Sequence, residues 1–368
     1  MNHVSENKLN SFIKNKKIKN ILIITGKKSF NFSGFKKLEI YQNFKSIIKI
    51  FYKKNEIPEI KELKFLIKKI NIINPDLIIA LGGGCAIDYA KLVNVLHNIK
   101  NLEQKIKSST LKMHSKKTKI LAIPTTAGSG AEVTKFSVLY INKIKHSVEH
   151  NLLKPDFYSL VPKLAISSPK IIRSSSGFDA IAQATESIFS KKSNIYSLKY
   201  SSKSLRHSIK NFLEFVNNPN IKNATQMLLA ANFSGKAINI TKTNAPHALS
   251  YSFTSKFKIP HGIAVSIFFI EIINLYYLNA IKRNNENLIK KFNLFFKLIK
   301  KSNIKGFNIL FHQFFLHSGI KKNLDRSLKK INYQNNFNFY YNSSRLKNSP
   351  IKILKDDINR LFLDKFKH

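Results

Sequence analysis

The stretch NPDLIIALGGGCAIDYAKLV, residues 74–93, decides the fold of this 368-residue chain. Its apolar run at 77–81 is typical of a strand that is buried on both faces of a parallel sheet. Three glycines at 82–84 predict a tight turn, and the pattern from Ala86 onward predicts a helix. A strand, a glycine turn and a helix in this order bring backbone N–H groups and a positive helix end to a phosphate. Three consecutive glycines also occur in turns that merely connect two elements. It is their position between a strand and a helix that indicates a phosphate site here.

Further apolar runs on both sides of this stretch predict more strands of the same sheet. The loop TTAGSGAEVT at 125–134 follows one of them, and its small residues either let the backbone approach a ligand or make a plain turn. Residues 38–71 have an apolar spacing that predicts largely helical structure. Alternating strands and helices predict a parallel sheet with ligands at the carboxyl ends of its strands. The predicted strands are 21–25, 77–81, 119–124, 138–141 and 163–166.

After about residue 168 the chain changes to long segments with helical periodicity and no strand pattern. The fold class is therefore α/β followed by all-α, with an α/β domain at 1–167 and a helical domain at 168–368. A chain of this length also exceeds one typical hydrophobic core, which favours two domains. The predicted helices of the second domain are 178–189, 194–215, 224–241, 263–281 and 287–300.

The chain is strongly basic, since 63 Lys and Arg against 20 Asp and Glu give a formal net charge of +43 at pH 7. Such a charge is typical of proteins that bind nucleic acid. Here, however, lysines run through nearly every segment and do not gather in one arm or stripe. We therefore expect no nucleic-acid partner, and keep a non-catalytic, basic nucleic-acid-binding protein as the alternative of another class. The charge would also attract anionic substrates.

The composition also indicates where the protein works. Cys85 is the only cysteine, which excludes an internal disulfide and fits a reducing cytoplasm. The first twenty residues contain no apolar signal core. The longest largely apolar run, 263–278, carries Glu271 in its middle and falls short of a membrane span. We expect a cytoplasmic protein without a membrane partner.

Two histidines, His247 and His261, lie fourteen residues apart among apolar and small residues. Upstream, Asp179 and Gln183 are one helical turn apart, so a carboxylate and an amide can point at one spot. A carboxylate, two imidazoles and an amide oxygen suit a divalent metal such as Fe(II) or Zn(II). Taken alone, the two histidines are also compatible with ordinary core or capping positions.

These segments together resemble the iron-containing (group III) alcohol dehydrogenase family, which shares its architecture with glycerol dehydrogenase and 3-dehydroquinate synthase. The resemblance implies a Rossmann-like, dinucleotide-binding parallel-sheet domain followed by an all-helical metal-binding domain, as in dehydroquinate synthase. It also implies a divalent metal, Fe2+ first and Zn2+ second, with NADPH or NADH as the hydride carrier. The matching segments are LGGGCAIDYAK at 81–91, PTTAGSGAEVT at 124–134, GFDAIAQATES at 177–187, the two-histidine stretch at 244–262 and SSRLKNSPIKILKDDI at 343–358.

The resemblance assigns roles to individual residues. The metal ligands would be Asp179, His247 and His261, with Gln183 as a fourth. Lys145 would line the cofactor site and assist catalysis. The remaining cofactor residues would be Gly82, Gly83, Gly84 and Asp88 at the pyrophosphate turn, and Thr125, Thr126, Ser129 and Gly130 beside the nicotinamide half.

Two of the departures from the family pattern bear on the chemistry. Gln183 stands where the family usually has histidine, and an amide oxygen is a weaker ligand, so the identity of the metal is in question. Tyr251 stands where the family often has a second histidine, four residues after His247. It is a candidate proton donor to the product, or a packing residue. Together with KHSVEH at 145–150, these residues resemble the subgroup of phosphonoacetaldehyde reductases, which convert phosphonoacetaldehyde to 2-hydroxyethylphosphonate.

The residues after the first predicted strand bear on the choice of cofactor. An acidic residue at this place normally binds the ribose hydroxyls and repels a 2′-phosphate. Here the chain has Gly26, Lys27, Lys28 and Ser29, and no acid. Lysines and a serine can receive a phosphate group. We therefore expect NADPH to be accepted, with NADH as the alternative.

The substrate is then an aldehyde and its primary alcohol, with a phosphonate as the specific candidate. Two rivals keep the fold and change the reaction: a general alcohol or polyol dehydrogenase, and a carbocycle-forming synthase of the dehydroquinate type. The synthase fits less well because the segments at 124–134 and 259–262 resemble the dehydrogenases more closely. The resemblance also implies a homodimer or a larger homo-oligomer.

Overall fold

The computed structural model describes residues 2–329, 341 and 343–366. The chain forms two compact units. The first comprises Met1–Pro169 with Asn220–Leu228, and the second comprises Lys170–Pro219 with Leu229–His368. The predicted domains, 1–167 and 168–368, remain a prediction about which parts fold as independent domains.

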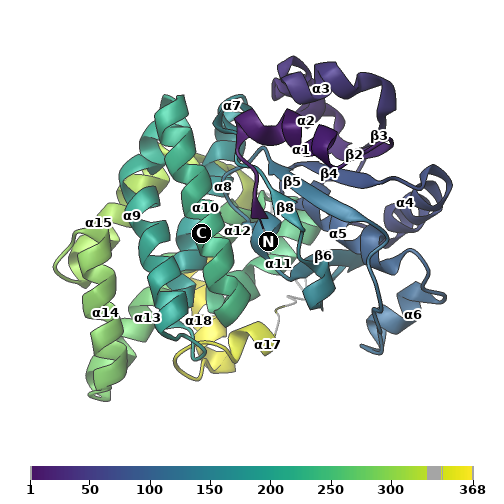
Figure 1. Ribbon diagram of the computed structural model, residues 1–368. Coiled ribbons are helices and arrows are strands. Elements are labelled where there is room, and N and C mark those ends of the chain that lie inside the picture. The colour runs from purple at the N-terminus through teal and green to yellow at the C-terminus, as the bar shows by residue number, and fades with distance from the viewer. Residues whose placement is uncertain (1, 330–340, 342, 367–368) are drawn as a thin grey trace. The chain divides into compact units, whose positions relative to one another are not determined.

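Among the described residues of the first unit, six parallel strands form one sheet in the order β1-β8-β5-β4-β2-β3 (Figure 1). The predicted strands at 21–25, 77–81 and 119–124 are its three central strands. Their register places Ile23 beside Ile79, and Ile79 beside Leu121. The strands are β1 Asn2–His3, β2 Ile21–Gly26, β3 Ile48–Lys53, β4 Leu77–Gly82, β5 Lys119–Pro124 and β8 Phe157–Tyr158.

Helices cover both faces of this sheet, which explains why its central strands are apolar throughout. In β4, Ile78 and Ala80 pack against α4, α5 and α6 on one face, while Leu77 and Ile79 pack against α1, α2, α3 and α7 on the other. This alternation follows from the two-residue repeat of a strand. The two groups of helices lie on opposite sides of the strands in Figure 1. Their bounds are α1 Leu9–Asn15, α2 Lys27–Phe32, α3 Glu39–Phe44, α4 Ile60–Ile73, α5 Gly84–Leu96, α6 Leu102–Lys107 and α7 Pro162–Ile166.

Two of the predicted elements of this unit are wrong. The predicted strand at 163–166 is the helix α7, because Pro162 occupies its first position, where proline is pre-organised for a helix. The segment 38–71, predicted as largely helical, contains the edge strand β3 between α3 and α4. On β3 no side chain is fully buried, as expected for an edge strand, so the segment lacks the continuous apolar run by which the central strands are recognised.

The predicted strand at 138–141 exists but belongs to another sheet. It lies in β6, Phe136–Ile141, which pairs antiparallel with β7, Ile144–Glu149. The two-residue turn between them has positive φ at both Asn142 and Lys143, as a tight hairpin turn requires. Lysine is an unusual residue for this conformation, and the turn was therefore not apparent from the sequence.

The second unit is helical. The range 263–281, predicted as one helix, is broken at residues 267–268 into α12 and α13. The first residues of α10 belong to the segment 220–228 that groups with the first unit. The helices are α8 Lys170–Phe189, α9 Ile195–Asn217, α10 Ile221–Thr241, α11 Ala245–Phe257, α12 His261–Ser266, α13 Phe269–Lys282, α14 Glu286–Ile299, α15 Ile304–His317, α16 Ile320–Leu328, α17 Ser343–Leu346 and α18 Lys355–Phe366.

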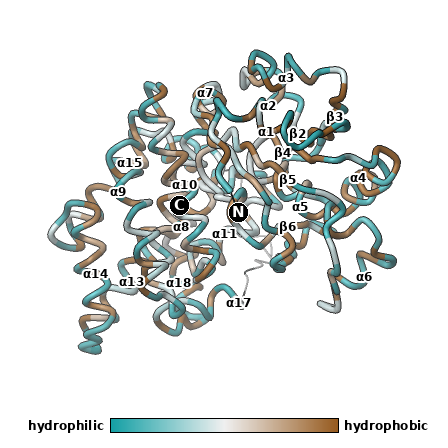
Figure 2. Tube along the Cα trace, in the orientation of Figure 1, coloured by the Kyte–Doolittle hydropathy of each residue, from teal (hydrophilic) through white to brown (hydrophobic). Residues whose placement is uncertain are grey.

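Aromatic side chains fill the core of the helical unit. Phe178 on α8 contacts Phe269 on α13 and Phe315 on α15 edge to face, each at a centroid distance of 5.1 Å. Figure 2 shows hydrophobic and hydrophilic residues alternating along α13 and α14, as in helices with one buried face. Within the described residues, the stretch His261–Lys282 is long and apolar enough to cross a membrane, but 67% of its apolar window is buried in the structure. Such burial is typical of a core helix.

Candidate functional site

Three of the predicted metal ligands converge in the helical unit. Asp179 on α8, His247 on α11 and His261 on α12 each offer one ligand atom, and these atoms lie within 4.8 Å of one another. His247 Nε2 is 3.1 Å from Asp179 Oδ1, and the two imidazole rings lie 5.2 Å apart at 72°. Two imidazoles and a carboxylate are a donor set that suits Fe(II) or Zn(II). Because Asp179 and His247 are buried and their atoms point at one place, these residues fit a divalent cation.

The start of α11 is built to hold His247. Asn244 caps this helix, and its Oδ1 accepts a hydrogen bond of 2.8 Å from the backbone N–H of Ala245. Pro246 occupies the first turn, where the missing N–H costs no helical hydrogen bond. His247 therefore lies in a rigid first turn and not on a loop.

Glu186 is a site residue that the sequence reading missed. It lies on α8 seven residues after Asp179, and its side chain is fully buried. Its carboxylate contacts His247 Nδ1 and accepts hydrogen bonds from the backbone N–H groups of Asn244 (2.9 Å) and His247 (3.3 Å). The spacing of Asp179, Gln183 and Glu186, four and then three residues apart, puts all three on one helix face. This polar stripe in an apolar segment is the sequence signal that could have identified Glu186.

The electrostatics of this cluster are shaped by burial and by the paired groups. Burial alone lowers the pKa of His247, but the charge of Glu186 and the hydrogen bonds to Asp179 and Glu186 outweigh it and raise that pKa to about 9. Burial raises the pKa of Asp179, but the hydrogen bond from His247 and the charges of His261 and His247 bring it below its ordinary value. Asp179 therefore stays ionised in a buried place, as a metal ligand must.

Gln183 and Tyr251 lie beside these residues. Gln183 Oε1 accepts a hydrogen bond of 3.1 Å from Ser234 Oγ, and its side chain also hydrogen-bonds to Asp179. Tyr251 is 5% exposed and lies on α11, one turn after His247. The structure thus places both residues on the helices that carry the ligands.

The predicted cofactor residues gather at the carboxyl ends of three strands in the first unit. Gly26 ends β2, Gly82 ends β4, and Thr125 directly follows β5. The glycine turn and the following loop touch. A Cβ atom at Gly83 would lie 3.2 Å from Thr126 Oγ1, and one at Gly84 would lie 3.0 Å from Ser129 Oγ. Gly130, also predicted, has a positive φ of 59°.

Asp88 is buried beneath this turn. Its Oδ2 accepts a hydrogen bond of 3.0 Å from the backbone N–H of Val138 on β6, and its Oδ1 is 3.8 Å from Lys91 Nζ. Burial raises the pKa of Asp88, against the opposing charges of Lys91 and Lys145. Asp88 therefore connects α5 to the hairpin that carries Lys145.

Beside Gly26, two further polar groups approach the turn. Ser29 Oγ would lie 3.6 Å from a Cβ atom at Gly26, and Lys53 Nζ would lie 3.9 Å from it. Lys53, at the end of β3, was not predicted from the sequence because β3 itself was missed. Lys27 begins α2 and is exposed.

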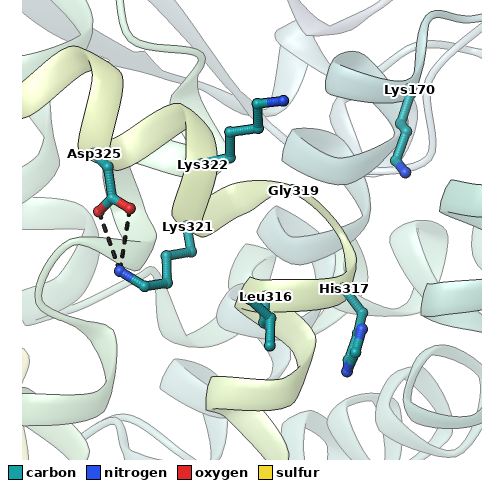
Figure 3. A pocket seen from close by; sticks show the side chains of 7 residues that line it. All are labelled: Lys170, Leu316, His317, Gly319, Lys321, Lys322 and Asp325. Atoms are coloured by element: carbon teal, nitrogen blue, oxygen red, sulfur yellow. Dashed lines mark hydrogen bonds and ion pairs between the residues drawn. The ribbon is translucent and has the colours of Figure 1, made fainter.

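A surface hollow of about 480 Å³ lies elsewhere in the helical unit (Figure 3). Lys321 in its wall pairs with Asp325 at 3.1 Å. None of the predicted site residues, all of which the structure describes, lines it. The hollow is lined by Lys170, Leu316, His317, Gly319, Lys321, Lys322 and Asp325.

Comparison with known families gives a match for each part of the chain. Residues 2–165 match the model of the family described as iron-containing alcohol dehydrogenase. Residues 173–364 match the model described as Fe-containing alcohol dehydrogenase family, C-terminal. The two matches follow each other in the order that the sequence motifs predicted.

Individual relatives are more distant. The chain is 29% identical to 4-hydroxybutyrate dehydrogenase of Clostridium kluyveri over 241 residues, which cover 64% of this chain and 63% of the relative. It is 30% identical to long-chain-alcohol dehydrogenase 1 of Geobacillus thermodenitrificans over 190 residues, covering 51% and 48%. The match thus spans less than two thirds of the length of these relatives.

Solved structures share the fold over the whole chain. Sulfoacetaldehyde reductase from Bifidobacterium kashiwanohense, in complex with NAD+, has a TM-score of 0.82 at 20% identity, covering 100% of this chain and 97% of that one. Iron-containing alcohol dehydrogenase from Thermococcus thioreducens has a TM-score of 0.84 at 18% identity, covering 100% and 98%. At this identity the likeness shows the fold: a parallel-sheet part followed by a helical part.

Proposed function

The chain belongs to the iron-containing alcohol dehydrogenase family, and on this premise we propose that it interconverts an aldehyde and a primary alcohol. The single observation that carries the proposal is the convergence of ligand atoms from the buried Asp179 and His247 and the partly buried His261 within 4.8 Å. The first measurement is oxidation of NADPH and NADH by protein loaded with Fe(II) or Zn(II), with several aldehydes. Absence of turnover with either metal would contradict the proposal.

The metal-binding residues of the proposal are Asp179, His247 and His261, with Gln183 as a fourth. A bound Fe2+ or Zn2+ would supply a Lewis acid that polarises the carbonyl oxygen. The chain's own part is to keep the carboxylate ionised and both rings turned to one point. Ser234 and Asp179 fix the amide of Gln183 by hydrogen bonds, so Gln183 at least orients the ligand carboxylate.

Tyr251 is our candidate for the residue that donates the proton required to form the product alcohol. It lies one turn after His247 on α11, and i and i+4 residues share a helix face. Lys145 is the second candidate for a catalytic role. It lies on β7, and its positive charge opposes the rise in the pKa of Asp88 that burial causes.

The proposed dinucleotide site lies at the carboxyl ends of β2, β4 and β5. Gly83 and Gly84 let Thr126 and Ser129 of the following loop pack against the turn, and α5 begins at Gly84, so its N-terminal N–H groups face the turn. Near Gly26, Lys27, Ser29 and Lys53 supply cations and a hydroxyl where an NAD-specific site would have an acid. We therefore propose that NADPH is accepted and preferred. A ratio of the NADPH and NADH dissociation constants that favours NADH would contradict this.

The proposed substrate is phosphonoacetaldehyde, reduced to 2-hydroxyethylphosphonate in phosphonate metabolism. Gln183 and Tyr251 support it through their resemblance to that subgroup, and the net charge of +43 favours an anionic substrate. The structural neighbour is named for sulfoacetaldehyde, which is likewise a small aldehyde with an anionic group. The second candidate is a general alcohol or polyol dehydrogenase, favoured by the names of the relatives that act on 4-hydroxybutyrate and long-chain alcohols. A higher kcat/KM for a neutral aldehyde than for phosphonoacetaldehyde would favour the second.

We further propose that the protein is a cytoplasmic homodimer or larger homo-oligomer with no nucleic-acid partner. The single cysteine supports a reducing compartment. Mass photometry of the purified protein would measure the oligomeric state, and a monomeric mass would contradict the proposal.

A further inference from the structure

We propose that Glu186 is a positioning residue for the metal, because its carboxylate fixes which nitrogen of His247 carries a proton. This inference rests on the proposed function only in that it needs a cation at Asp179, His247 and His261. It concerns the binding of the metal and makes no assumption about the substrate.

Glu186 contacts both the imidazole ring of His247 and the backbone at the start of α11. One carboxylate oxygen meets His247 Nδ1, and the other accepts the backbone N–H groups of Asn244 and His247 at 2.9 and 3.3 Å. The backbone carbonyl of Glu186 also accepts a hydrogen bond of 2.9 Å from Asn244 Nδ2. Glu186 therefore holds the imidazole and the turn that carries it at the same time.

The chemistry of these contacts decides the tautomer of His247. An ionised carboxylate only accepts hydrogen bonds, so the hydrogen between Glu186 and His247 lies on Nδ1. Without a cation, Nε2 donates to Asp179 Oδ1 at 3.1 Å, and it is this nitrogen that would lose its hydrogen and offer its lone pair to a bound cation. Nε2 thus faces the other candidate ligands. A carboxylate that orients a ligand histidine through its second nitrogen also strengthens metal binding.

A network around Asn244 fixes the backbone turn that carries His247. Asn244 Oδ1 accepts hydrogen bonds from Tyr276 Oη at 3.2 Å and from the N–H of Ala245 at 2.8 Å. Rotation of His247 would therefore break the contact with Glu186 while the cap of α11 stays in place. The geometry gives Glu186 one function that an amide could not perform. The amide oxygen of a glutamine could accept from the two backbone N–H groups. Its NH2 group only donates, so it could not accept a hydrogen bond from His247 Nδ1 at the same time.

Glu186→Gln is thus a sharp test. Its Nε2 group would donate to His247 Nδ1, which would place the ring hydrogen on Nε2 and block the ligand atom. We expect the dissociation constant for Co(II), measured by visible absorption in competition with a chelator, to rise about 10- to 100-fold. Glu271→Gln is the matched control in the same unit, since that carboxylate pairs with Lys365 at 2.6 Å and touches no candidate ligand. Its Co(II) affinity should equal that of the wild type.

Two outcomes of this comparison would overturn the inference. One is an unchanged Co(II) dissociation constant and spectrum in Glu186→Gln. The other is an equal loss of Co(II) affinity in Glu271→Gln. The thermal midpoint of the metal-free proteins is recorded alongside, because a purely structural role would lower that midpoint without changing the metal spectrum.

A measurement on the wild type keeps the inference testable if Glu186→Gln does not fold. In Zn(II)-loaded protein with ¹⁵N-labelled histidine, NMR should show a hydrogen on Nδ1 of His247 and the metal on Nε2. The signal is assigned by its loss in His247→Asn. Metal on Nδ1 would overturn the inference. A wild type that binds no Co(II) or Zn(II) would overturn both this inference and the metal site, whereas a metal-binding wild type without aldehyde turnover would contradict only the proposed function.

Discussion

Gly262 lies so close to Ser175 that a Cβ atom added to it would stand 1.9 Å from the Ser175 carbonyl oxygen. The backbone N–H of Gly262 also donates to Ser175 Oγ at 3.0 Å. The contact brings α12 onto α8, and it lies next to two candidate ligands, His261 on α12 and Asp179 on α8. The distance between these ligands therefore depends on a side chain being absent at position 262.

We predict that Gly262→Ala pushes α12 away from α8. The overlap is with backbone atoms, which cannot move aside like the end of a flexible side chain. We expect the free energy of unfolding in urea to fall by about 1–3 kcal/mol, and the Co(II) affinity to fall as well. Gly306→Ala is the control, because its new Cβ would meet only the side chain of Lys301 at 3.1 Å. Equal stability and affinity in the two variants would show that the close approach is unimportant.

Asn348 should be the strongest single contact of the C-terminal segment. Its Nδ2 donates to the carbonyls of Thr241 (2.7 Å) and Thr243 (3.0 Å), and its Oδ1 accepts from Ser190 Oγ (3.0 Å). Asn348→Ala would remove all three hydrogen bonds. Ser190 Oγ can still donate to the Thr241 carbonyl at 3.3 Å, and each buried group that is left unpaired costs about 1–3 kcal/mol before relaxation. We expect urea denaturation to show a loss of more than about 2 kcal/mol.

The control for this prediction is Asn217→Ala. Asn217 makes one longer, exposed bond, from its Nδ2 to the carbonyl of His317 at 3.3 Å. Its loss should cost much less. Should the two variants unfold at the same urea concentration, the segment at 348 would contribute no more than an ordinary surface contact.

The sequence predicted the parts of the fold that local patterns determine. The strand and the turn at residues 77–84 could both be predicted, because an apolar run and consecutive glycines are recognisable from neighbouring residues alone. The strand at 48–53 and the helix at 162–166 were missed, because an edge strand has only half-buried side chains and α7 is too short to show a helical period. Their structure depends on the sheet against which they pack.

The candidate site divides in the same way. Asp179, His247 and His261 could be named from motifs, but Glu186 required the knowledge that α8 and the start of α11 pack together. Lys53 similarly approaches Gly26 only because β3 pairs with β2 in the sheet. Contacts between segments far apart in the chain have no local pattern from which they could be read.

Lys91 provides a prediction about pH. Burial lowers its pKa to about 8, against the opposing charges of Asp88 and Glu132, while an unfolded lysine has a pKa of about 10.4. Between these values the unfolded chain binds more protons than the folded one, so the contribution of Lys91 to stability rises with pH. The full change is on the order of 3 kcal/mol.

The test of this prediction compares the wild type with Lys91→Met from pH 7 to pH 10. The difference in the free energy of unfolding should increase in favour of the wild type across this range. Lys91 Nζ donates to the carbonyls of Ala131 (3.0 Å) and Phe136 (2.6 Å). Lys91→Met loses these bonds, so it should be less stable than the wild type at the upper end of the pH range. Lys64→Met, which removes an exposed pair with Glu103, should show no such slope relative to the wild type. A difference that stays constant or decreases with pH would contradict the prediction.

Gly82 should be essential for the dinucleotide and irrelevant for the metal. It ends β4 with a φ of 147°, and an added Cβ would stand 2.9 Å from Ala86 Cβ. Gly82→Ala would therefore strain the turn by about 1–3 kcal/mol, and each 1.4 kcal/mol lost from binding weakens the affinity about tenfold. We expect the NADPH dissociation constant, from fluorescence titration, to rise by about tenfold or more.

Two readouts separate this effect from a general loss of structure. Gly34→Ala is the matched control, since Gly34 also has a positive φ (87°) but no atom within 4 Å of its added Cβ. It should lose some stability and retain NADPH binding. The Co(II) affinity of Gly82→Ala should equal that of the wild type, because the candidate ligands Asp179, His247 and His261 belong to the other unit. If Gly34→Ala lost NADPH binding to the same extent, the effect would come from backbone strain anywhere in the unit, and the glycine turn would have no special part in holding the cofactor.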